Sequence, residues 1–548
     1  MIYPNRFLAL IFLHGLLFSC NSNDQNKTES NIENKIYSSK NHSELFLDSL
    51  ILNKFFDQQT HYKSIKESMI GFYKKRSYQF AWISEGQINE SALANYAQVK
   101  NNQLEAGSDS LGISFLDSFL LNANVANKNL LIKENVQHLE MQLTASLFLF
   151  AQQENSGKMR DLLALEWFIP RKKKILSILI DSMLSGKMQL KSFEPTNRYY
   201  QGLKAQLMIH LKWQVTGNWP VFPFPLKPVK IGEIDSSISN IKNLLTCTGD
   251  WHQNERSLLF TPEMKFAIQH FQHRMGLTET GKLDKATLFE LQIPIQERIK
   301  QILLNLERLK WLPDSVAGTF LLINIPEFKL HLFKNGKPVW ESNVVVGSEA
   351  GKTSVFTGKI SQIILNPTWG VPPGMIKSEV LADLKRHSDY LKTHNMLVYE
   401  QNTLINGNRI NWHKFTDKIP YTIRQQPGGD NPLGRFKLLF PNSFHIYLHD
   451  TPARELFKAS KRDKSHGCIR VEKIRELVDT LLKSNLEWTT EKVNETLTTN
   501  VETGISLKPK VPVYMVYLTS WVSKDGLLNF RQDVYGKDSV LTKALFGD

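Results

Sequence analysis

The apolar residues of this chain change their periodicity once, and that change constrains the fold more than any other feature. Up to about residue 227, long runs such as Leu139 to Ala151 carry apolar residues at helical spacing. Beyond Trp311-Leu312-Pro313 the apolar residues form short β-branched runs, of which Thr319 to Ile325 is the first. A chain of 548 residues is several times the size of a typical domain. We therefore expect a multidomain α+β protein in which helical domains precede a β-rich one.

Two helical regions precede the β-rich part. The first, 44–230, ends in a proline-rich linker and is expected to form a scaffold domain. The second, 231–297, is a small module in which Thr261 suits the N-cap of a helix and Pro262 its first position. Residues 298–317 are expected to connect this module to the β-rich domain. The apolar residues of this helix form one stripe, which predicts its buried face: Met264, Ile268, Phe271 and Met275. Asp284 is expected to cap the next helix.

The C-terminal domain, 318–548, contains a series of predicted strands. Asn335-Gly336 between two of them is a strong hairpin signal. Pro372-Pro373 opens an insert rich in charged and aromatic residues, about 374–424, which we interpret as a mobile lid. A helix is predicted from Glu472 to Leu482. The predicted strands cover 319–325, 329–334, 339–346, 360–365, 434–439 and 444–449, and a C-terminal pair, 511–518 and 527–530, is joined through Asp525-Gly526.

The first twenty residues indicate export. Phe7 to Phe18 is almost wholly apolar, too short for a membrane-spanning helix of about 20 residues but suited to a secretory signal. Leu17-Phe18-Ser19-Cys20 resembles a bacterial lipobox, so residues 1–19 would be removed and Cys20 would carry a lipid. Ordinary signal cleavage beside an incidental cysteine is the alternative. Residues 20–43 are rich in Asn, Ser, Lys and Glu, as in a flexible tether.

The chain is basic, with a net charge of +14. Such an excess favours anionic partners: nucleic acid, acidic lipid headgroups or an anionic wall polymer. Export makes a nucleic-acid partner a poor candidate. We therefore expect a cell-envelope protein that meets the membrane through its lipid anchor.

The three cysteines have different surroundings. Beyond Cys20, Cys247 lies in an apolar helical stretch and is expected to be a buried structural thiol. A disulfide between Cys247 and Cys468 is arithmetically available, but a disulfide framework needs denser cysteine usage. Cys468 lies in Ser465-His466-Gly467-Cys468, beside an imidazole and a flexible glycine. It is the candidate reactive thiol.

A zinc site and a Cys/His nucleophilic pair compete for the residues around Cys468. His445, His449 and His466 lie within 24 residues of one another and of Cys468. If residues 444–449 form a strand, two histidines four apart lie about 13 Å from each other. Zinc–nitrogen bonds of about 2.0–2.1 Å cannot bridge that separation. The spacing therefore argues against a metal, and we expect no cofactor.

The nucleophile interpretation assigns each residue a task. A free thiol has a pKa of about 8.5, so a base or a cation must assist its ionisation. His449 can accept the thiol proton and return it to a leaving amine. Arg470 can hold a carboxylate or favour the thiolate. Gly467 allows a tight turn, which can direct backbone amides at a developing oxyanion.

The segments around these residues resemble the signature of the L,D-transpeptidases, the YkuD-like family that cross-links peptidoglycan. The matching segments are 446–452 (IYLHDTP) and 465–471 (SHGCIRV). Residues 267–291 resemble a three-helix peptidoglycan-binding module. With the helical N-terminus and the lid, the arrangement is similar to the large subgroup found in Gram-negative envelopes. Further matches lie at 365–369, 371–373, 426–428, 431–437 and 533–536.

The resemblance implies a role for each site residue. Cys468 would be the nucleophile and His449 its general acid/base, oriented by the backbone carbonyl of Asp450. Tyr447, expected on the same strand face as His449, can shape the pocket. Two departures from the family pattern lie outside the proposed chemistry: Thr353 is followed by serine rather than proline, and position 445 is histidine. His466, Gly467 and Arg470 occupy the remaining fixed places of the motif.

The resemblance also implies a reaction. Cys468 would attack the third residue of a tetrapeptide stem and release D-alanine. The side-chain amine of a diamino acid in a second stem would then take the acyl group, giving a 3→3 cross-link. Water as acceptor would make the site a carboxypeptidase. A cysteine hydrolase of wall peptides and a non-catalytic wall-binding lipoprotein remain alternatives. We expect a monomer on the periplasmic side of the envelope.

Overall fold

The computed structural model describes residues 43–547 except 85–86, 107–110, 112–113, 115, 118–132, 172–174, 185–192, 223–225, 254–256 and 417. The predicted signal peptide, the lipidation site Cys20 and nearly all of the tether lie outside the described residues. Within the described part, no helix has the length and apolar character needed to cross a membrane. The chain divides into two compact units, residues up to 152 with 174–193, and 153–173 with 194–548.

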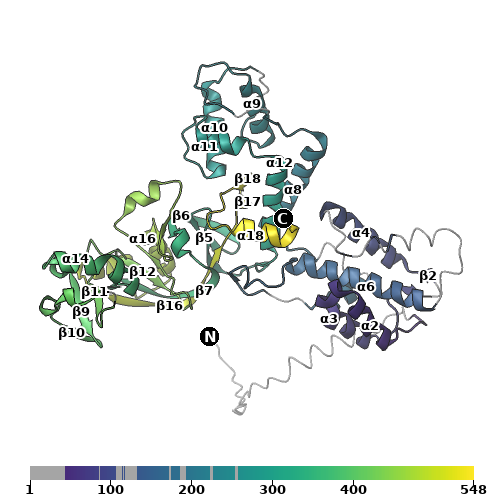
Figure 1. Ribbon diagram of the computed structural model, residues 1–548, viewed down its shortest axis with the longest axis horizontal. Coiled ribbons are helices and arrows are strands. Elements are labelled where there is room, and N and C mark those ends of the chain that lie inside the picture. Colours follow the sequence, from purple (N-terminus) through teal and green to yellow (C-terminus); the bar gives the residue numbers. More distant parts are fainter. Residues whose placement is uncertain are drawn as a thin grey trace, which may run out of the picture. The chain divides into compact units, whose positions relative to one another are not determined.

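The first unit is mostly helical (Figure 1). Its helices bury one apolar core, in which Phe72, Ala145 and Phe148 are inaccessible to solvent. The carboxylate of Glu140 lies inside this unit and accepts the backbone N–H of Ala81 at 2.6 Å. The elements are α2 (Ser49–Gln58), α3 (Lys66–Lys75), β1 (Ile83–Ser84), β2 (Gln87–Ile88), α4 (Glu90–Ala106), α6 (Lys133–Ser156) and α7 (Leu176–Leu184).

The second unit is built around a closed ring of strands. The order is β12–β13–β15–β6–β5–β4–β16–β7, and β7 pairs again with β12 to close the ring. Two short strands add to it, β3 on β7 and β14 on β6. The predicted α+β class is therefore confirmed. The strands are β3 (Trp167–Phe168), β4 (Thr319–Asn324), β5 (Lys329–Lys334), β6 (Lys337–Gly347), β7 (Val355–Leu365), β12 (Phe436–Leu439), β13 (Leu448–His449), β14 (Asp463–Ser465), β15 (Ile469–Val471) and β16 (Thr503–Val516).

The predicted hairpin at Asn335-Gly336 joins β5 to β6. Both residues have positive φ, 51° and 75°. Such a turn matches the right-handed twist of the two strands, and these two residue types tolerate its backbone conformation. The hairpin prediction is confirmed.

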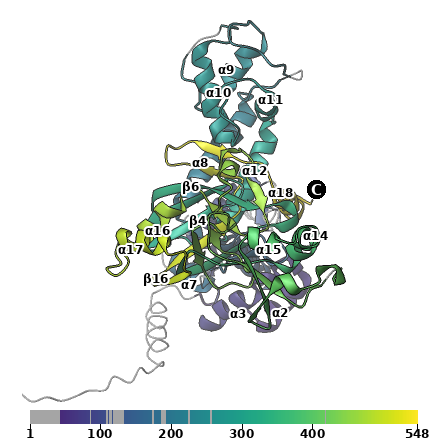
Figure 2. The same ribbon diagram turned by 90° about the vertical axis from the view of Figure 1, so that its left-hand side faces the viewer.

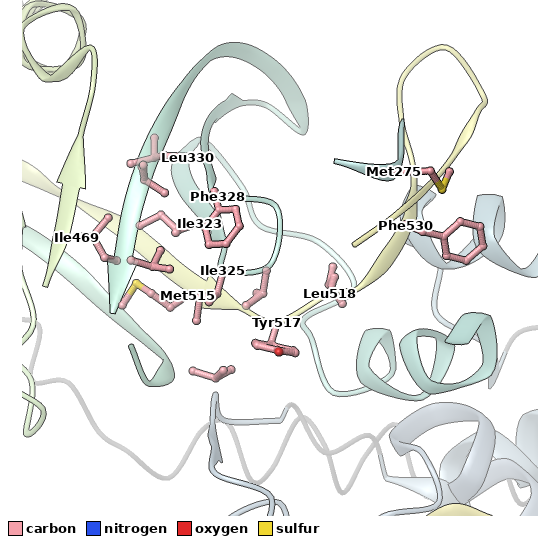
Figure 3. Packing of buried hydrophobic residues seen from close by; sticks show 14 of the residues in the cluster. Met275, Ile323, Ile325, Phe328, Leu330, Ile469, Met515, Tyr517, Leu518 and Phe530 are labelled. Carbon is pink, nitrogen blue, oxygen red and sulfur yellow. The ribbon is translucent and has the colours of Figure 1, made fainter. Parts of the chain in front are cut away.

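The interior of the ring is filled by alternate apolar side chains of its strands (Figure 3). Ile323, Leu330 and Met515 are completely buried there, together with Ile469 from the strand that follows the candidate nucleophile. Because side chains of a strand alternate between its faces, the neighbours of these residues in sequence point away from this core. The core thus fixes which residues face outward near Cys468.

The expected strand over 444–449 is wrong except at its end. Only Leu448 and His449 are extended, as β13. Before them the chain turns, with His445 at a φ of 56°. The side-chain amide of Asn442 causes this turn, since its oxygen accepts the N–H of Ile446 at 3.1 Å and its nitrogen donates to the carbonyl of the same residue at 2.8 Å. These backbone groups would otherwise be available to a strand ladder.

The strand predicted over 511–518 does not pair with the one at 527–530. Its counterpart β16 lies between β4 and β7, whereas β18 (Leu528–Phe530) pairs with β17 (Ser520–Val522). The chain leaves β16 near Leu518, whose N–H is bound by the side chain of Asn324 at 2.9 Å. This side-chain acceptor replaces the ladder bond that would continue the strand.

The helical module lies in the same unit as the strand ring, and its helices α9, α10 and α11 lie together in Figure 2. Thr261 caps α10 by accepting the N–H of Met264 at 3.3 Å, as predicted, and Gly276 ends the helix in the left-handed conformation. Asp284 caps α11, as predicted. The helices are α8 (Arg198–Thr216), α9 (Ser237–Cys247), α10 (Pro262–Met275), α11 (Lys285–Leu291) and α12 (Ile295–Leu309). Since α8 belongs to this unit, the region 44–230 is divided between the two units.

Two arginines join the module to the C-terminal hairpin β17–β18. Arg274 at the end of α10 donates to the carboxylate of Asp250 at 2.9 Å and to the carbonyl of Leu528. Arg531, just past β18, donates to the carbonyl of Arg274 at 2.6 Å. Cationic groups at a helix C-terminus satisfy carbonyls that lack partners within the helix. The module is therefore fastened to the domain that follows it.

Cys247 is half-buried rather than buried, which corrects the prediction. It is the last residue of α9, where the buried face of the helix reaches the surface. Its thiol is free, as is that of Cys468, so the two form no disulfide.

The insert after β7 forms a small subdomain of its own. Its strands pair in the order β10–β9–β11–β8, and its apolar side chains form a separate core that includes Leu391, Val398 and Trp412. Tyr447 packs against this core. The elements are β8 (Trp369–Gly370), α13 (Pro373–Met375), α14 (Leu381–Arg386), α15 (Tyr390–Thr393), β9 (Met396–Glu400), β10 (Thr403–Ile405) and β11 (Thr422–Gln425). Three helices complete the unit: α16 (Ile474–Leu482), close to the prediction, α17 (Thr490–Thr498) and α18 (Lys537–Phe546).

Candidate active site

Three adjacent strands bring the candidate residues together. β13 runs parallel to β15, with His449 opposite Arg470, and antiparallel to β12, with His449 opposite Lys437. Paired residues project from the same face of a sheet. Lys437, His449 and Arg470 therefore form one row across the three strands, with the imidazole in the middle. The adjacent row faces the core and consists of Leu438, Leu448 and Ile469, all fully buried.

The imidazole of His449 is held in one orientation. Its Nδ1 lies 2.5 Å from the carbonyl oxygen of Asp450. Because that oxygen can only accept, Nδ1 carries the proton and Nε2 keeps its lone pair. The expected contact between the histidine and this backbone carbonyl is present.

Burial and positive charge keep this imidazole neutral. His449 is 6% exposed. Burial, the guanidinium of Arg470 and the ammonium of Lys437 together lower its pKa to about 3. Backbone carbonyls of Asp450 and Pro432 oppose this shift. His449 is therefore an unprotonated base at neutral pH.

The side chain of Asp450 has a structural task. Its Oδ2 accepts the backbone N–H of Arg435 at 3.0 Å, and Oδ1 lies 3.3 Å from Nη1 of Arg454. A Cβ on Gly434 would overlap this carboxylate, so glycine is needed there. The carboxylate is thus occupied away from the imidazole, and only the backbone oxygen of Asp450 contacts His449.

The thiol of Cys468 lies at the start of β15 and is half-buried. Its Sγ is 3.7 Å from the carbonyl oxygen of His445. Burial raises the pKa of the thiol, while the backbone N–H and hydroxyl of Tyr447, which hydrogen-bond to the sulfur, and the charge of Lys437 lower it in part. Among the described residues the imidazole of His449 makes no hydrogen bond to Sγ. The structure thus presents a protonated, resting thiol.

Tyr447 lies just before β13 and touches each part of the site. Its phenol interacts with the thiol of Cys468, and burial raises the pKa of that phenol. Its ring centroid is 5.7 Å from that of His449. The Nζ of Lys437 lies 4.1 Å from the ring centroid, within the range of a cation–π interaction.

The loop before the thiol is tightly braced. Gly467 has a φ of 112°, and its carbonyl accepts the hydroxyl of Thr353 at 2.8 Å. Its own N–H donates to Oγ of Ser465 at 3.2 Å. The N–H of Cys468 has no backbone or side-chain acceptor among the described residues. Of the amides predicted to face an oxyanion, that of Gly467 is therefore occupied and that of Cys468 is available.

The remaining predicted residues differ in their surroundings. His466 is exposed and makes no hydrogen bond to the part of the chain that the structure describes. Arg470 is half-buried, and its Nε is buried without a hydrogen-bond partner. Burial lowers the pKa of this guanidinium, and the charge of Glu455 opposes that change.

His445 lies outside β13, which corrects the premise of the prediction against a zinc site. His445 and His449 are not on one strand, so their separation along an extended strand does not apply. Among the described residues, no group of three or more His, Cys, Asp or Glu side chains is arranged to hold a metal ion.

Residues 318–504 match the family described as the L,D-transpeptidase catalytic domain. This part of the C-terminal domain is therefore similar to the L,D-transpeptidase catalytic domain. Residues 67–207 match the Scaffold domain family, and residues 235–291 match the family described as "Putative peptidoglycan binding domain".

One curated relative and two solved structures are similar to this chain. A Haemophilus influenzae protein named "Putative L,D-transpeptidase" is 35% identical over 246 residues, covering 45% of this chain and 49% of that protein. The chain thus aligns with about half the length of this relative. The crystal structure of an L,D-transpeptidase from Stackebrandtia nassauensis has 13% identity and a TM-score of 0.22, covering 54% of this chain and 97% of that one. L,D-transpeptidase 1 of Mycobacterium tuberculosis has 10% identity and a TM-score of 0.16, covering 36% and 61%.

Sequence reasoning missed two residues of the site. Lys437 was read only as part of a motif, although a single lysine in the apolar segment Phe436 to Phe440 is a signal in itself. Thr353 enters the sequence analysis only as the residue before one departure from the family pattern, the serine that follows it. Its hydroxyl also accepts the N–H of Gly347 at 2.9 Å, so it ties β6 to the loop that carries Cys468.

We predict that Gly347→Ala damages the site and Gly370→Ala does not. A Cβ on Gly347 would overlap the backbone of Gly351 and Thr353, whereas a Cβ on Gly370 meets nothing within 4 Å. Overpacking of this kind costs about 1–3 kcal/mol. Thermal unfolding and the alkylation rate of Cys468 measure the two effects, and equal behaviour of the two variants would refute the bracing role.

Tyr447→Phe should move the alkylation of Cys468 to higher pH. In the wild-type protein the midpoint of the rate with iodoacetamide should lie above about 8.5, the value of a free cysteine, because burial raises the thiol pKa. Loss of the phenol hydroxyl removes a hydrogen bond that favours the thiolate, so the midpoint rises further. Tyr399→Phe, a change in the insert, is the matched control. An unchanged midpoint in Tyr447→Phe would contradict the contact.

Proposed function

We propose that this protein is a peptidoglycan L,D-transpeptidase that forms 3→3 cross-links through a thioester on Cys468. The observation that carries the proposal is the shared face of β12, β13 and β15. A half-buried thiol and a neutral, oriented imidazole belong to this face, and two cations flank the imidazole. Acyl transfer by a cysteine nucleophile requires a thiol and an adjacent base of this kind.

In the acylation half-reaction, Sγ of Cys468 attacks the carbonyl of the third residue of a tetrapeptide stem. The thiol proton passes to Nε2 of His449, whose Nδ1 proton stays bound to the Asp450 carbonyl. We assign the N–H of Cys468 and the hydroxyl of Tyr447 as the donors to the developing oxyanion. As the intermediate collapses, the carbon–nitrogen bond breaks, and the departing D-alanine amine takes the proton from His449.

The second half-reaction reverses these proton movements. His449 accepts a proton from the side-chain amine of a second stem as that amine attacks the thioester. The carbon–sulfur bond breaks, and the proton returns to Cys468. No nucleotide is consumed, since the thioester conserves the energy of the cleaved peptide bond.

Substrate binding must bring the imidazole and the thiol into hydrogen-bond contact. In the free protein the thiol is engaged by Tyr447, not by His449. Catalytic hydrogen bonds are often long in free enzymes and tighten in the substrate complex. The insert packs on Tyr447, which makes it the segment placed to transmit binding to the thiol.

The same proposal assigns an address and partners. The peptidoglycan-binding match at residues 235–291 supports an envelope location, with stem peptides as donor and acceptor. Export, lipidation at Cys20, attachment to a membrane on its periplasmic side and a monomeric state remain predictions from the sequence.

Incubation with tetrapeptide-bearing muropeptides tests the function. Intact-protein mass spectrometry of the wild type should show an acyl adduct that lacks D-alanine, and muropeptide dimers should appear. Cys468→Ala should retain its fold and lose the adduct completely. D-alanine release without dimers would identify a carboxypeptidase, internal cleavage a hydrolase, and binding alone a wall-binding protein. Any of these three outcomes would overturn the proposal.

Removal of the insert tests its part in acceptor choice. Gln425 of β11 pairs with Trp369 of β8, so a short Gly-Ser linker that replaces residues 374–424 leaves this pair in place. We expect this variant to hydrolyse a larger share of its acyl-enzyme, because water then reaches the thioester. The ratio of dimers to released tripeptide measures this. An unchanged ratio would remove the insert from the mechanism.

A further inference from the structure

Two cations flank the base, and neither forms an ion pair with a described residue. The ammonium group of Lys437 makes no hydrogen bond in the described part of the chain. Arg470 likewise has no ion pair in the described part of the chain, and its Nε is buried without an acceptor. Unpaired cations in a partly buried site carry a desolvation cost, which an anion would relieve.

Other cations around the site do have partners. Arg435 donates to the side chain of Asn366 at 3.0 Å, and Arg454 lies 3.3 Å from Asp450. Lys461 pairs with a carboxylate at 3.3 Å. The acid whose charge acts on Lys437 is Glu502, and its carboxylate already accepts a backbone amide. The isolation of Lys437 is therefore a local feature of the face that carries the thiol.

The ammonium group of Lys437 lies beside the thiol. Its Nζ is 4.1 Å from the ring centroid of Tyr447, and the hydroxyl of that tyrosine contacts Sγ of Cys468. The charge of Lys437 acts on both Cys468 and His449. An anionic group bound to Nζ would thus belong to a part of the substrate close to the carbonyl carbon that Sγ attacks.

We propose that Lys437 binds the terminal carboxylate of the leaving D-amino acid, and that this ion pair makes His449 an effective base only when a donor is present. The inference rests on the proposed function and deepens it. In a donor whose scissile bond is its last, the terminal carboxylate is separated from the attacked carbonyl carbon by only one nitrogen and one α-carbon. A stem that is one residue longer presents a peptide bond at that place. Lys437 would therefore select stems that end at the leaving residue.

The gating follows from the charges that face the imidazole. Lys437 comes from β12, Arg470 from β15, and the carbonyls of Asp450 and Pro432 from the adjoining loops. Both cations disfavour protonation of His449, which makes it a weak base in the free enzyme. A carboxylate paired with Lys437 offsets one of the two positive charges, so the affinity of Nε2 for the thiol proton rises. The same ion pair also offsets the charge with which Lys437 lowers the thiol pKa, so the gating acts through the base and leaves the thiol protonated until Nε2 takes its proton during attack.

Acylation by two matched donors tests this role. One tetrapeptide donor has a free terminal carboxylate and the other a terminal carboxamide, and each is offered to the wild type, Lys437→Met and Lys437→Arg. We expect the wild type to prefer the acid by about tenfold to a hundredfold in kcat/KM, the usual range for a charge-assisted hydrogen bond. In Lys437→Met, kcat/KM for the acid donor should fall to the value for the amide donor, and the value for the amide donor should not change. Lys437→Arg should keep part of the preference for the acid donor. Lys483 is exposed at the C-terminal end of α16. The control variant Lys483→Met should behave as the wild type.

The gating has its own readout. With the acid donor, the acid limb of the acylation rate should lie at higher pH than with the amide donor, because the bound carboxylate raises the pKa of His449. In Lys437→Met, the acid limb of the acylation rate should lie at the same pH for both donors. Iodoacetamide alkylation of Cys468 in the same variant reports whether the pocket is intact without any donor.

The outcomes separate the inference from the proposed function. Equal slowing of both donors in Lys437→Met would make the lysine a structural residue and overturn the inference, while the acyl adduct would still support transpeptidation. A wild type that discriminates between the donors no better than Lys437→Met would also overturn it. No adduct with either donor in the wild type would refute the proposed function itself, and the inference with it.

Discussion

The site depends on the register of three short strands. One row of residues across β12, β13 and β15 is apolar and buried, and the neighbouring row carries Lys437, His449 and Arg470. A slip of one residue in any of these strands would bury a charge and expose an apolar side chain. The hydrophobic energy of the core thus specifies the positions of the polar groups, although none of those groups contributes to it.

Much of this arrangement follows from the sequence, and the exceptions have local causes. Runs of β-branched and apolar residues predicted most strands of the ring, and capping residues predicted α10, because both depend on neighbours within one segment. The strand before His449 was mispredicted because one side-chain amide, that of Asn442, binds the backbone groups of the following residues. Lys437 was missed because alternation gives the face of a residue but not the strand that becomes its neighbour. The contact of His449 with a carbonyl rather than a carboxylate could be expected only from family resemblance.

The electrostatics of the site describe a protein that is unreactive until it is occupied. The thiol pKa is raised by burial, and the imidazole pKa is depressed by burial and two cations. Such a pair exchanges a proton poorly in the free state, which protects the cysteine from oxidation. The reactivity of the thiol therefore depends on what is bound at the site. The cations beside His449 lack an anion, the phenol of Tyr447 binds the sulfur, and the insert packs on that phenol.

The arginine contacts between α10 and the β17–β18 hairpin have a consequence for how far the helical module can move relative to the strand ring. Arg274 and Arg531 tie the end of the module's central helix to the segment that follows the strand ring. A module fastened in this way works as a spacer of constant length. If its outer surface rests on one strand of a mesh, the thiol can reach only those neighbouring strands that lie at one particular separation.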